Sequence, residues 1–242
     1  MRDRLPWSLF ALTCLIAVGH VTVLAFDERP LLTTHSLAAG FPLVTIGAVT
    51  GAGVGALILT RYPHHRIGWL FLVGQLLTEF DVAAQAYGEA ALNGDIEGAP
   101  AGHLAIWLSV MFGSIVTLTY LAILFLLAPD GQLLSRRWRW AAYASIAGVV
   151  AHTAAVASVR PSEFDAESQV EGGAGPVVEA LVLGGLLLVC LGLTAAAVSL
   201  VIRLRRSSGA GRHQLWWMVL AAGALTAGAL VGVTLAVAGA PA

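Results

Sequence analysis

Residues 177–202 read VVEALVLGGLLLVCLGLTAAAVSLVI, an apolar run in which Glu179 is the one charged residue. A helix of about 20 apolar residues is long enough to cross the hydrocarbon core of a bilayer. Within lipid, the backbone must satisfy its hydrogen bonds inside the segment itself. This run is therefore predicted to be a transmembrane helix.

The rest of the 242-residue chain repeats this pattern. Hydrophobic residues make up 58% of it and charged residues only 11%, whereas soluble domains carry roughly a quarter charged residues. The alternating segments of about 10 residues that are typical of outer-membrane barrels are absent. We predict an all-α fold, a single transmembrane domain over residues 1–242, with about seven helices at residues 7–26, 37–60, 68–90, 103–128, 140–158, 177–202 and 215–239.

The first apolar segment, residues 7–26, follows Arg2 and Arg4 and could be mistaken for a secretory signal. A signal core spans only about 7 to 15 residues and ends at a small-x-small cleavage site. This segment is longer and ends in Leu-Ala-Phe-Asp. We expect it to be a retained helix.

The arginines predict the orientation in the membrane. Eleven of the 13 basic residues lie before the first segment or in every second connection, and the alternate connections are acidic. By the positive-inside rule, the N-terminus is cytoplasmic, and seven crossings put the C-terminus outside. The longest connection, residues 159–176, is far shorter than the roughly 50 residues that a soluble domain needs. We therefore expect a multi-pass membrane protein that is not an enzyme.

Glycines recur in two of the predicted helices. Gly47, Gly51 and Gly55 form Gly-x-x-x-Gly twice. A nucleotide-binding loop would need a preceding strand and access to water, whereas small residues four apart let transmembrane helices approach closely. Helix packing is thus predicted here, and likewise for Gly228 and Gly232.

The third segment is interrupted by polar residues. A carboxylate at the bilayer centre costs about 2.5 to 3.5 kcal/mol, so these side chains should face the interior of the bundle. Asp81, Gln85 and Glu89 are spaced four apart on one stripe of the helix, while Glu79 points elsewhere. Gln75 completes the polar set.

Two histidines are predicted to lie at the same depth as Asp81. His20 and His152, like Asp81, are 12 or 13 residues from the cytoplasmic ends of their segments, or about 18 to 20 Å. Asp81 at that depth either pairs with a histidine or carries a proton. We predict a buried polar layer that binds a ligand or responds to pH, formed by His20, Glu79, Asp81, Gln85 and His152. The alternative is that these groups only hydrogen-bond within the bundle.

Other functions for these residues are weaker alternatives. The third-helix carboxylates also suit a small transporter or a proton-conducting protein, although no inverted repeat is evident. A redox subunit could hold haem or quinone through His20, His103 or His152. No Cys/His spacing typical of a zinc site occurs, and we predict neither a metal nor a cofactor.

Three short motifs recur at the predicted cytoplasmic ends. One is Ile67-Gly68-Trp69-Leu70 after Arg61-x-Pro63, and the second is Pro129-Asp130-Gly131-x-Leu133 running on to Ser135-Arg136-Arg137-Trp138. The third runs from Arg203-x-Arg205-Arg206 through Gly211-Arg212-x-Gln214-Leu215 to Trp217. In this order, the motifs resemble the N-terminal membrane domain of actinobacterial sensor histidine kinases, over most of residues 37–239.

The resemblance implies a membrane input domain whose cytoplasmic positions couple signals or stabilise the fold. Those positions are Gly68, Trp69, Pro129, Asp130, Gly131, Arg136, Arg137, Gln214 and Trp217. Ala128 replaces a frequent aromatic residue of the family, and Trp216 a frequent basic one. A phosphoacceptor helix and ATP-binding boxes are missing, so kinase activity is not implied, and the chain is either a stand-alone relative or a fragment.

Together with the resemblance, these patterns predict a non-enzymatic, sensor-like or signalling-associated, multi-pass subunit of a bacterial plasma membrane. Its expected partners are the lipid bilayer and a protein that docks through the cytoplasmic loops or the transmembrane helices. No nucleic-acid partner is expected.

Overall fold

The computed structural model describes residues 4–26, 32, 36, 40–96, 100–170, 172–208 and 210–239. These residues are helices and connections, with one isolated β-bridge between Phe164 and Val170 and no strand. Seven segments are long and apolar enough to cross a membrane. The predicted all-α, polytopic class is confirmed.

Large apolar side chains cover much of the helix surfaces. Leu15, Leu43, Val150 and Val177, for example, are each at least 60% exposed. Soluble proteins rarely expose contiguous apolar surface on this scale, whereas lipid tails accommodate it. This surface is consistent with a multi-pass membrane protein.

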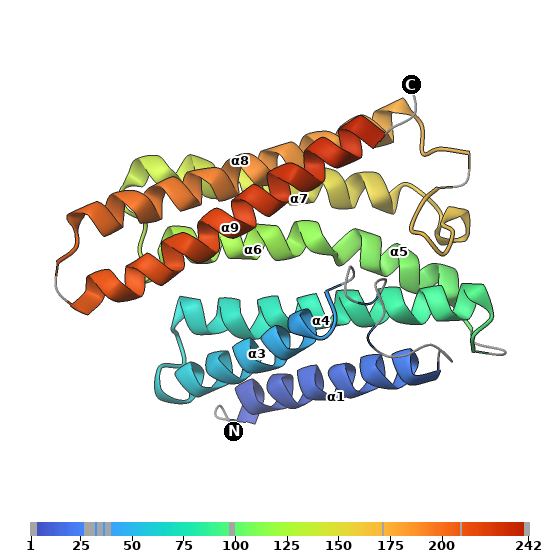
Figure 1. Ribbon diagram of the computed structural model, residues 1–242, viewed down its shortest axis with the longest axis horizontal. Helices are drawn as coiled ribbons and strands as arrows, with labels where there is room; N and C mark the ends of the chain where they lie inside the picture. Colours follow the sequence, from blue (N-terminus) through green and yellow to red (C-terminus); the bar gives the residue numbers. More distant parts are fainter. Residues whose placement is uncertain are drawn as a thin grey trace. The chain divides into compact units, whose positions relative to one another are not determined.

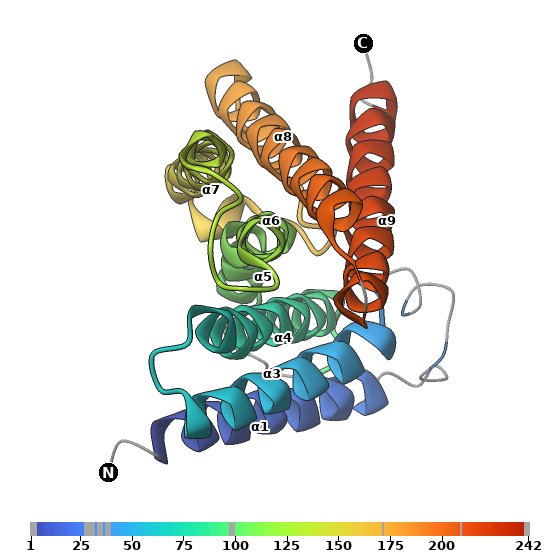
Figure 2. The same cartoon turned by 90° about the vertical axis from the view of Figure 1, so that its left-hand side faces the viewer.

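The contacts within the chain define two compact units: Met1–Thr117 with Ala155–Glu179, and Leu118–Ala154 with Ala180–Ala242. The first unit is built from α1 (Arg4–Phe26), α3 (Leu43–Arg61), α4 (Arg66–Asn93), α5 (Gly102–Phe112) and the short 3-10 helix η2 (Pro161–Glu163). Helices α1 and α3 contact each other and both contact α4, which also contacts α5 (Figures 1 and 2). Helix α4 is therefore central to this unit.

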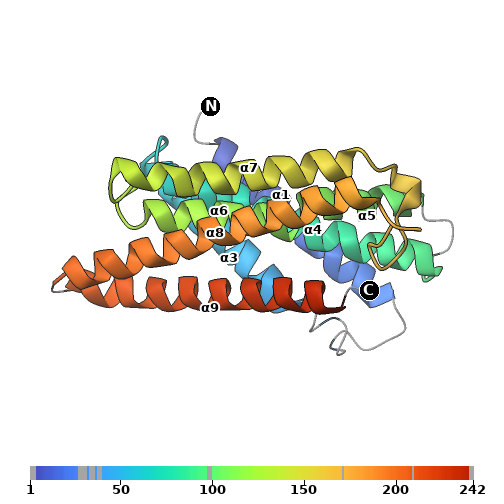
Figure 3. The same cartoon turned by 90° about the horizontal axis from the view of Figure 1, so that it is seen from above.

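The second unit contains most of α6 (Ser114–Leu127), η1 (Arg136–Trp138), α7 (Arg139–Ala157), α8 (Pro176–Arg206) and α9 (Ala210–Gly239). In Figure 3, the end of α6 and the start of α7 lie at the same end of this unit as the end of α8 and the start of α9. Its core is formed by fully buried aliphatic side chains of α6, α8 and α9, including Leu126, Leu193, Leu200 and Ala222. Consecutive helices of this unit thus run in opposite directions.

Two predicted helices differ in their start or continuity, and the last one, predicted from residue 215, begins already at Ala210. The second one begins at Leu43, because residues 40–42 form a turn that contains Gly40 at φ +92°; residues 37–39 lie outside the described part of the chain. The fourth one, predicted over 103–128, is two helices, since Gly113 leaves the helical conformation with ψ −141°. Residues 102–127 still form one membrane-length segment.

The glycines of α3 allow close contact with α4, as predicted. A Cβ at Gly55 would lie 2.7 Å from the backbone nitrogen of Leu72 and 2.8 Å from the carbonyl oxygen of Gly68. At Gly51 a Cβ would meet the side chain of Gln75 at 2.8 Å. Gly47 differs, because no atom of the described residues lies within 4 Å of its Cβ position. The packing prediction is confirmed for Gly51 and Gly55.

The same prediction for Gly228 and Gly232 is wrong for the part of the chain that the structure describes. Among the described residues, nothing lies within 4 Å of a Cβ built at either glycine of α9. The close approach in the second unit occurs instead between α7 and α8. There, a Cβ at Gly148 would lie 2.5 Å from the carbonyl oxygen of Gly185. Spacing alone cannot tell which glycines face another helix, because it does not specify how each helix is rotated about its axis.

Candidate functional site

A histidine and a glutamate form a buried pair in the first unit. Nδ1 of His20 on α1 lies 3.1 Å from Oε1 of Glu79 on α4, and Glu79 is 0% exposed. The hydroxyl of Thr45 on α3 lies 3.2 Å from the same nitrogen. The other carboxyl oxygen of Glu79, Oε2, is buried and makes no hydrogen bond to any described residue. Three helices therefore meet at this cluster.

The position of Glu79 follows from the register of α4. Gly68, Leu72, Gln75 and Glu79 are spaced by three or four residues, so they share one face of the helix. Gly68 and Gln75 on this face approach α3 at Gly55 and Gly51, respectively. Because this face packs against α1 and α3, it carries Glu79 into the interior of the unit.

Asp81 belongs to a different face of α4. Two residues along an α-helix correspond to a rotation of about 200°, so Asp81 points away from the Glu79 side. Its Oδ1 accepts a hydrogen bond from the hydroxyl of Ser109 on α5 at 2.7 Å. The same oxygen lies 2.9 Å from a Cβ position at Gly113, where α5 ends. Of the two carboxyls, Glu79 and not Asp81 contacts His20.

The other predicted members of the polar layer are distributed over both units. Gln85 donates its side-chain amide to Oε1 of Glu89 at 2.9 Å, one turn along α4. His152 lies on α7 in the second unit, where its Cβ is 3.2 Å from a Cβ position at Gly185 of α8. Its membership of a common layer with His20 stays a prediction.

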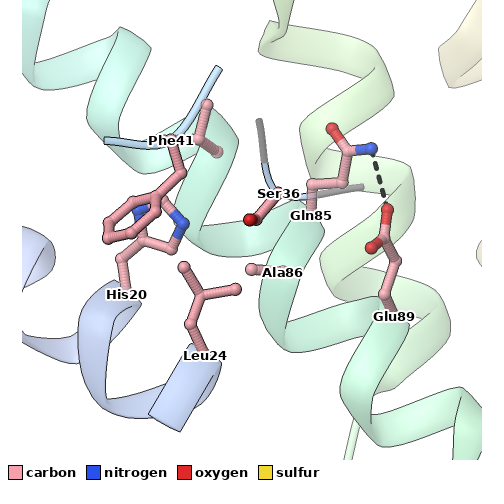
Figure 4. Close-up of a pocket in the computed structure, with 8 residues that line it drawn as sticks. His20, Leu24, Ser36, Phe41, Gln85, Ala86 and Glu89 are labelled. Atoms are coloured by element: carbon pink, nitrogen blue, oxygen red, sulfur yellow. Dashed lines mark hydrogen bonds between the residues drawn. The ribbon is translucent and has the colours of Figure 1, made fainter. Parts of the chain in front are cut away.

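A small cavity lies beside the His20–Glu79 pair. It has a volume of about 50 Å³ and is lined by His20, Leu24, Ser36, Phe41, Val82, Gln85, Ala86 and Glu89. The rings of Phe41 and His20 meet edge to face, with their centroids 5.7 Å apart. In Figure 4, Ser36, Gln85 and Glu89 lie on the side of the cavity opposite Leu24 and His20. His20 thus connects the cavity to the buried Glu79.

Sequence analysis alone did not identify four residues of this region. Thr45 and Ser109 are single hydroxyl residues within apolar segments, and such residues usually bond to their own helix backbone. Ser36 and Phe41 come from the connection before α3, where no helical spacing relates them to His20. Their contacts result from tertiary packing.

His103, a candidate haem ligand in the redox alternative, has a partner in the acidic connection. Its Nδ1 lies 2.8 Å from the carbonyl oxygen of Phe164, which is buried. Trp107 on the next turn of α5 donates its indole N–H to the carbonyl oxygens of Val156 and Val159. These bonds attach the connection after α7 to α5. Throughout the described ranges, no three His, Cys, Asp or Glu side chains lie close enough together to hold a metal ion.

The motif at residues 61–70 stabilises the turn between α3 and α4. The indole N–H of Trp69 donates to the carbonyl oxygen of Pro63 at 2.9 Å. A Cβ at Gly68 would approach the side chains of Ile58 and Leu59 at 3.0 Å. Both residues therefore have a structural role in this turn.

Two of the motifs meet in the second unit. The guanidinium of Arg203 on α8 donates to the carbonyl oxygens of Leu126 and Gln132 and lies 3.7 Å from the carboxylate of Asp130. A cation at these positions satisfies carbonyl groups at the end of α6 and complements the helix dipole. Gly131 forms the adjoining turn with φ +71°. Arg203 is part of the third motif but was not among the predicted coupling positions. In the structure, Arg203 links the third motif to the turn at residues 129–131.

Three of the remaining motif residues, Arg136, Arg137 and Trp217, are exposed. Arg136 and Arg137 in η1 are exposed. Trp217 on α9 is 60% exposed, packs edge to face on Trp216 and donates to His213 at 3.3 Å. Gln214 lies in the first turns of α9. Exposed arginines and tryptophans of this kind suit the interface between lipid and water.

Comparisons with known proteins do not extend this assignment. No family model, no curated protein and no solved structure matches the chain.

Proposed function

We propose that this protein is a non-enzymatic, sensor-like subunit of a bacterial plasma membrane, in which the cluster of Glu79, His20 and Thr45 receives the signal. The observation that carries the proposal is the complete burial of Glu79 against His20, next to a cavity that His20 lines. Ionisable groups within transmembrane segments are costly and commonly mark functional sites. The resemblance of the three motifs to a histidine-kinase membrane domain agrees with this role.

A change of charge in the cluster would alter the attraction among three helices. Glu79, His20 and Thr45 come from α4, α1 and α3. Helices α3 and α4 are joined at their far end by residues 62–65, which Trp69 holds through Pro63. A shift of α3 against α4 would therefore reach this turn, on the proposed cytoplasmic side. The expected receiver of the signal there is a partner protein.

The test is a sided pH change. A spin label is attached to a cysteine introduced by His64→Cys, in a chain carrying Cys14→Ala and Cys190→Ala, and the protein is reconstituted into liposomes. We expect the label spectrum to change when the pH on the cavity side falls from about 8 to about 5, because a change of charge within the cluster alters the attraction among its helices. Among the described residues, the titratable groups that contact His20 or line the same cavity are Glu79 and Glu89, both from α4. Helix α3 contributes Thr45.

Glu79→Gln, which keeps the shape but removes the charge, should abolish this response. Glu163→Gln is the matched control, because Glu163 is an exposed carboxylate in the connection after α7. It should leave the response unchanged. An absent response in the parent chain, or an equal response in Glu79→Gln, would refute the proposed sensor role.

A second function is favoured by the position of Asp81. Its carboxyl lies beside Gly113, where the fourth membrane segment is broken, and accepts a bond from Ser109. Transporters use broken helices and intramembrane carboxylates to bind ions or protons. We infer a proton- or cation-conducting alternative centred on Asp81.

Flux measurements distinguish this alternative. Proteoliposomes should then show a proton or sodium flux that Asp81→Asn lowers by at least about tenfold, as expected when the charged ligand of an ion is removed. Glu167→Gln in the exposed acidic connection is the control. Equal fluxes in liposomes with and without protein would eliminate conduction.

A further inference from the structure

We propose that an open groove at the start of α9 binds one anionic phospholipid through the phosphate of its headgroup. The groove has a volume of about 490 Å³ and is lined by Arg212, His213, Trp216 and Trp217. It belongs to the second unit, whereas the His20–Glu79 cluster belongs to the first. The depth of the groove along α9, the chemistry of its lining and the charge of its unit each favour such a lipid.

The groove lies at the start of the membrane-length part of α9. This part begins at Leu215, so Arg212 and His213 precede it and the two tryptophans lie in its first turn. From Arg212 to Trp217 the helix rises about 7.5 Å, which is similar to the depth of about 5–10 Å at the boundary between headgroups and acyl chains. Tryptophan is enriched at this level of a bilayer. The groove therefore lies at the depth of phospholipid headgroups.

The four lining residues share one side of α9. Arg212 and Trp216 are four residues apart, as are His213 and Trp217, so they form two adjacent rows on the helix. Leu215 is buried in the core of the second unit, and both rows are rotated at least about 60° away from it. Trp216 and Trp217 are 48% and 60% exposed, and the arginine and the histidine are exposed as well. The groove is thus open on the side of the helix that faces away from Leu215.

The lining combines hydrogen-bond donors with an aromatic wall. Nε1 of Trp217 donates to Nε2 of His213 at 3.3 Å. Because Nε2 accepts this bond, the neutral imidazole carries its proton on Nδ1, and this N–H can donate to a ligand. The guanidinium of Arg212 is a planar fork that binds phosphate oxygens in pairs. Trp216 and Trp217 meet edge to face, with their ring centroids 5.7 Å apart. Donors at the water end and rings at the apolar end match the phosphate and the glycerol esters of a phospholipid.

The charge of the second unit favours an anionic lipid over a zwitterionic one. By sequence, this unit contains seven arginines and a single side-chain carboxylate, that of Asp130. Asp130 lies 3.7 Å from Arg203, which leaves the other six arginines without a carboxylate of their own unit. These six are exposed, at the end of the unit where α7 and α9 begin (Figure 3): Arg136, Arg137, Arg139, Arg205, Arg206 and Arg212. Basic clusters of this kind attract anionic headgroups.

The size of the groove favours a lipid over a free anion. Inorganic phosphate has about five non-hydrogen atoms and needs roughly 50–75 Å³, at about 10–15 Å³ for each water-sized atom. The groove is several times larger, at about 490 Å³. The additional space is bordered by the rings of Trp216 and Trp217, which a phosphate ion alone would not contact but the glycerol region of a lipid would.

Binding is tested by native mass spectrometry on the full chain in micelles of a nonionic detergent. The chain is titrated with phosphatidylglycerol or with phosphatidylcholine of identical acyl chains. We expect the first phosphatidylglycerol to bind at least about tenfold more tightly than the first phosphatidylcholine, because only the former brings a net negative charge to the arginines. Inorganic phosphate at about 10 mM should not displace it, since a small ion lacks the contacts of the lipid with the rings.

Arg212→Gln should weaken the binding of phosphatidylglycerol by at least about tenfold, because the charge-assisted bonds to the phosphate are lost. His213→Phe, which keeps a ring but removes the Nδ1 donor, should weaken it by a few fold. The matched control is Arg139→Gln, which removes the same charge from the same end of the unit but does not line the groove. This control should weaken binding by less than about threefold, because salt screens charges outside the site.

Three results would overturn the inference. Equal affinities for the two lipids would show that charge does not select the ligand. Equal losses in Arg212→Gln and Arg139→Gln, with the helical circular dichroism of both variants unchanged, would show that the arginines attract lipid only collectively. Displacement by inorganic phosphate would indicate a site for small anions and not for a lipid.

Discussion

Replacing His20 by leucine is expected to destabilise the protein by about 3–5 kcal/mol, the usual cost of leaving one member of a buried ionic pair alone. Glu79 is 0% exposed, and its Oε2 already makes no hydrogen bond to the described residues. Without His20, Oε1 of Glu79 would lose the ring nitrogen that lies 3.1 Å away. Neither carboxyl oxygen would then have the imidazole as a partner. The measurement is the free energy of unfolding in mixed micelles, from a denaturing-detergent titration.

The double variant His20→Leu/Glu79→Leu should recover most of this loss. Leucine has a volume similar to that of either residue, and replacing both members of a buried pair by apolar residues is often neutral. A coupling energy of about 2 kcal/mol or more between the two substitutions is therefore expected. Additive losses would mean that the two side chains do not interact energetically, which would contradict the pairing.

Gly55→Ala is expected to disrupt the contact between α3 and α4 in the first unit. The added methyl group would lie 2.7 Å from the nitrogen of Leu72 and 2.8 Å from the oxygen of Gly68, both backbone atoms of α4. Because backbone atoms within a helix cannot move aside individually, α3 and α4 must separate. Such overpacking costs about 1–3 kcal/mol, measured by the same unfolding titration.

Gly47→Ala is the matched control for this substitution. Gly47 lies two turns earlier on α3, and in the part of the chain that the structure describes nothing is within 4 Å of its Cβ position. Alanine is favoured over glycine inside a helix by about 0.5–1 kcal/mol, so this variant should be neutral or slightly more stable. Equal losses at Gly47 and Gly55 would show that the effect does not arise from the contact with α4.

Much of the candidate site was accessible from helical spacing. Positions 79 and 81 are two residues apart, so they had to face different sides of one helix, and they do contact different helices. Interior placement of the third-helix polar residues followed from the cost of exposing carboxylates to lipid. The identity of the partner was not accessible, because depth along a helix does not fix its rotation about the axis.

The sequence by itself determined the all-α, seven-segment architecture. Length and apolarity alone decide whether a segment can cross a bilayer. A single segment in lipid must also form its backbone hydrogen bonds internally, which a helix does. It also marked Gly51, Gly55, Glu79 and His20 as residues of interest.

Only the tertiary structure decided which of these residues meet. It selected Glu79 over Asp81 as the partner of His20, selected Gly55 over Gly228 as a close contact, and brought Arg203 to the turn after α6. It also supplied Ser36 and Phe41 to the cavity from a connection without helical periodicity. The physical reason is that such contacts depend on the rotation and packing of whole helices, which residues distant in the sequence determine together.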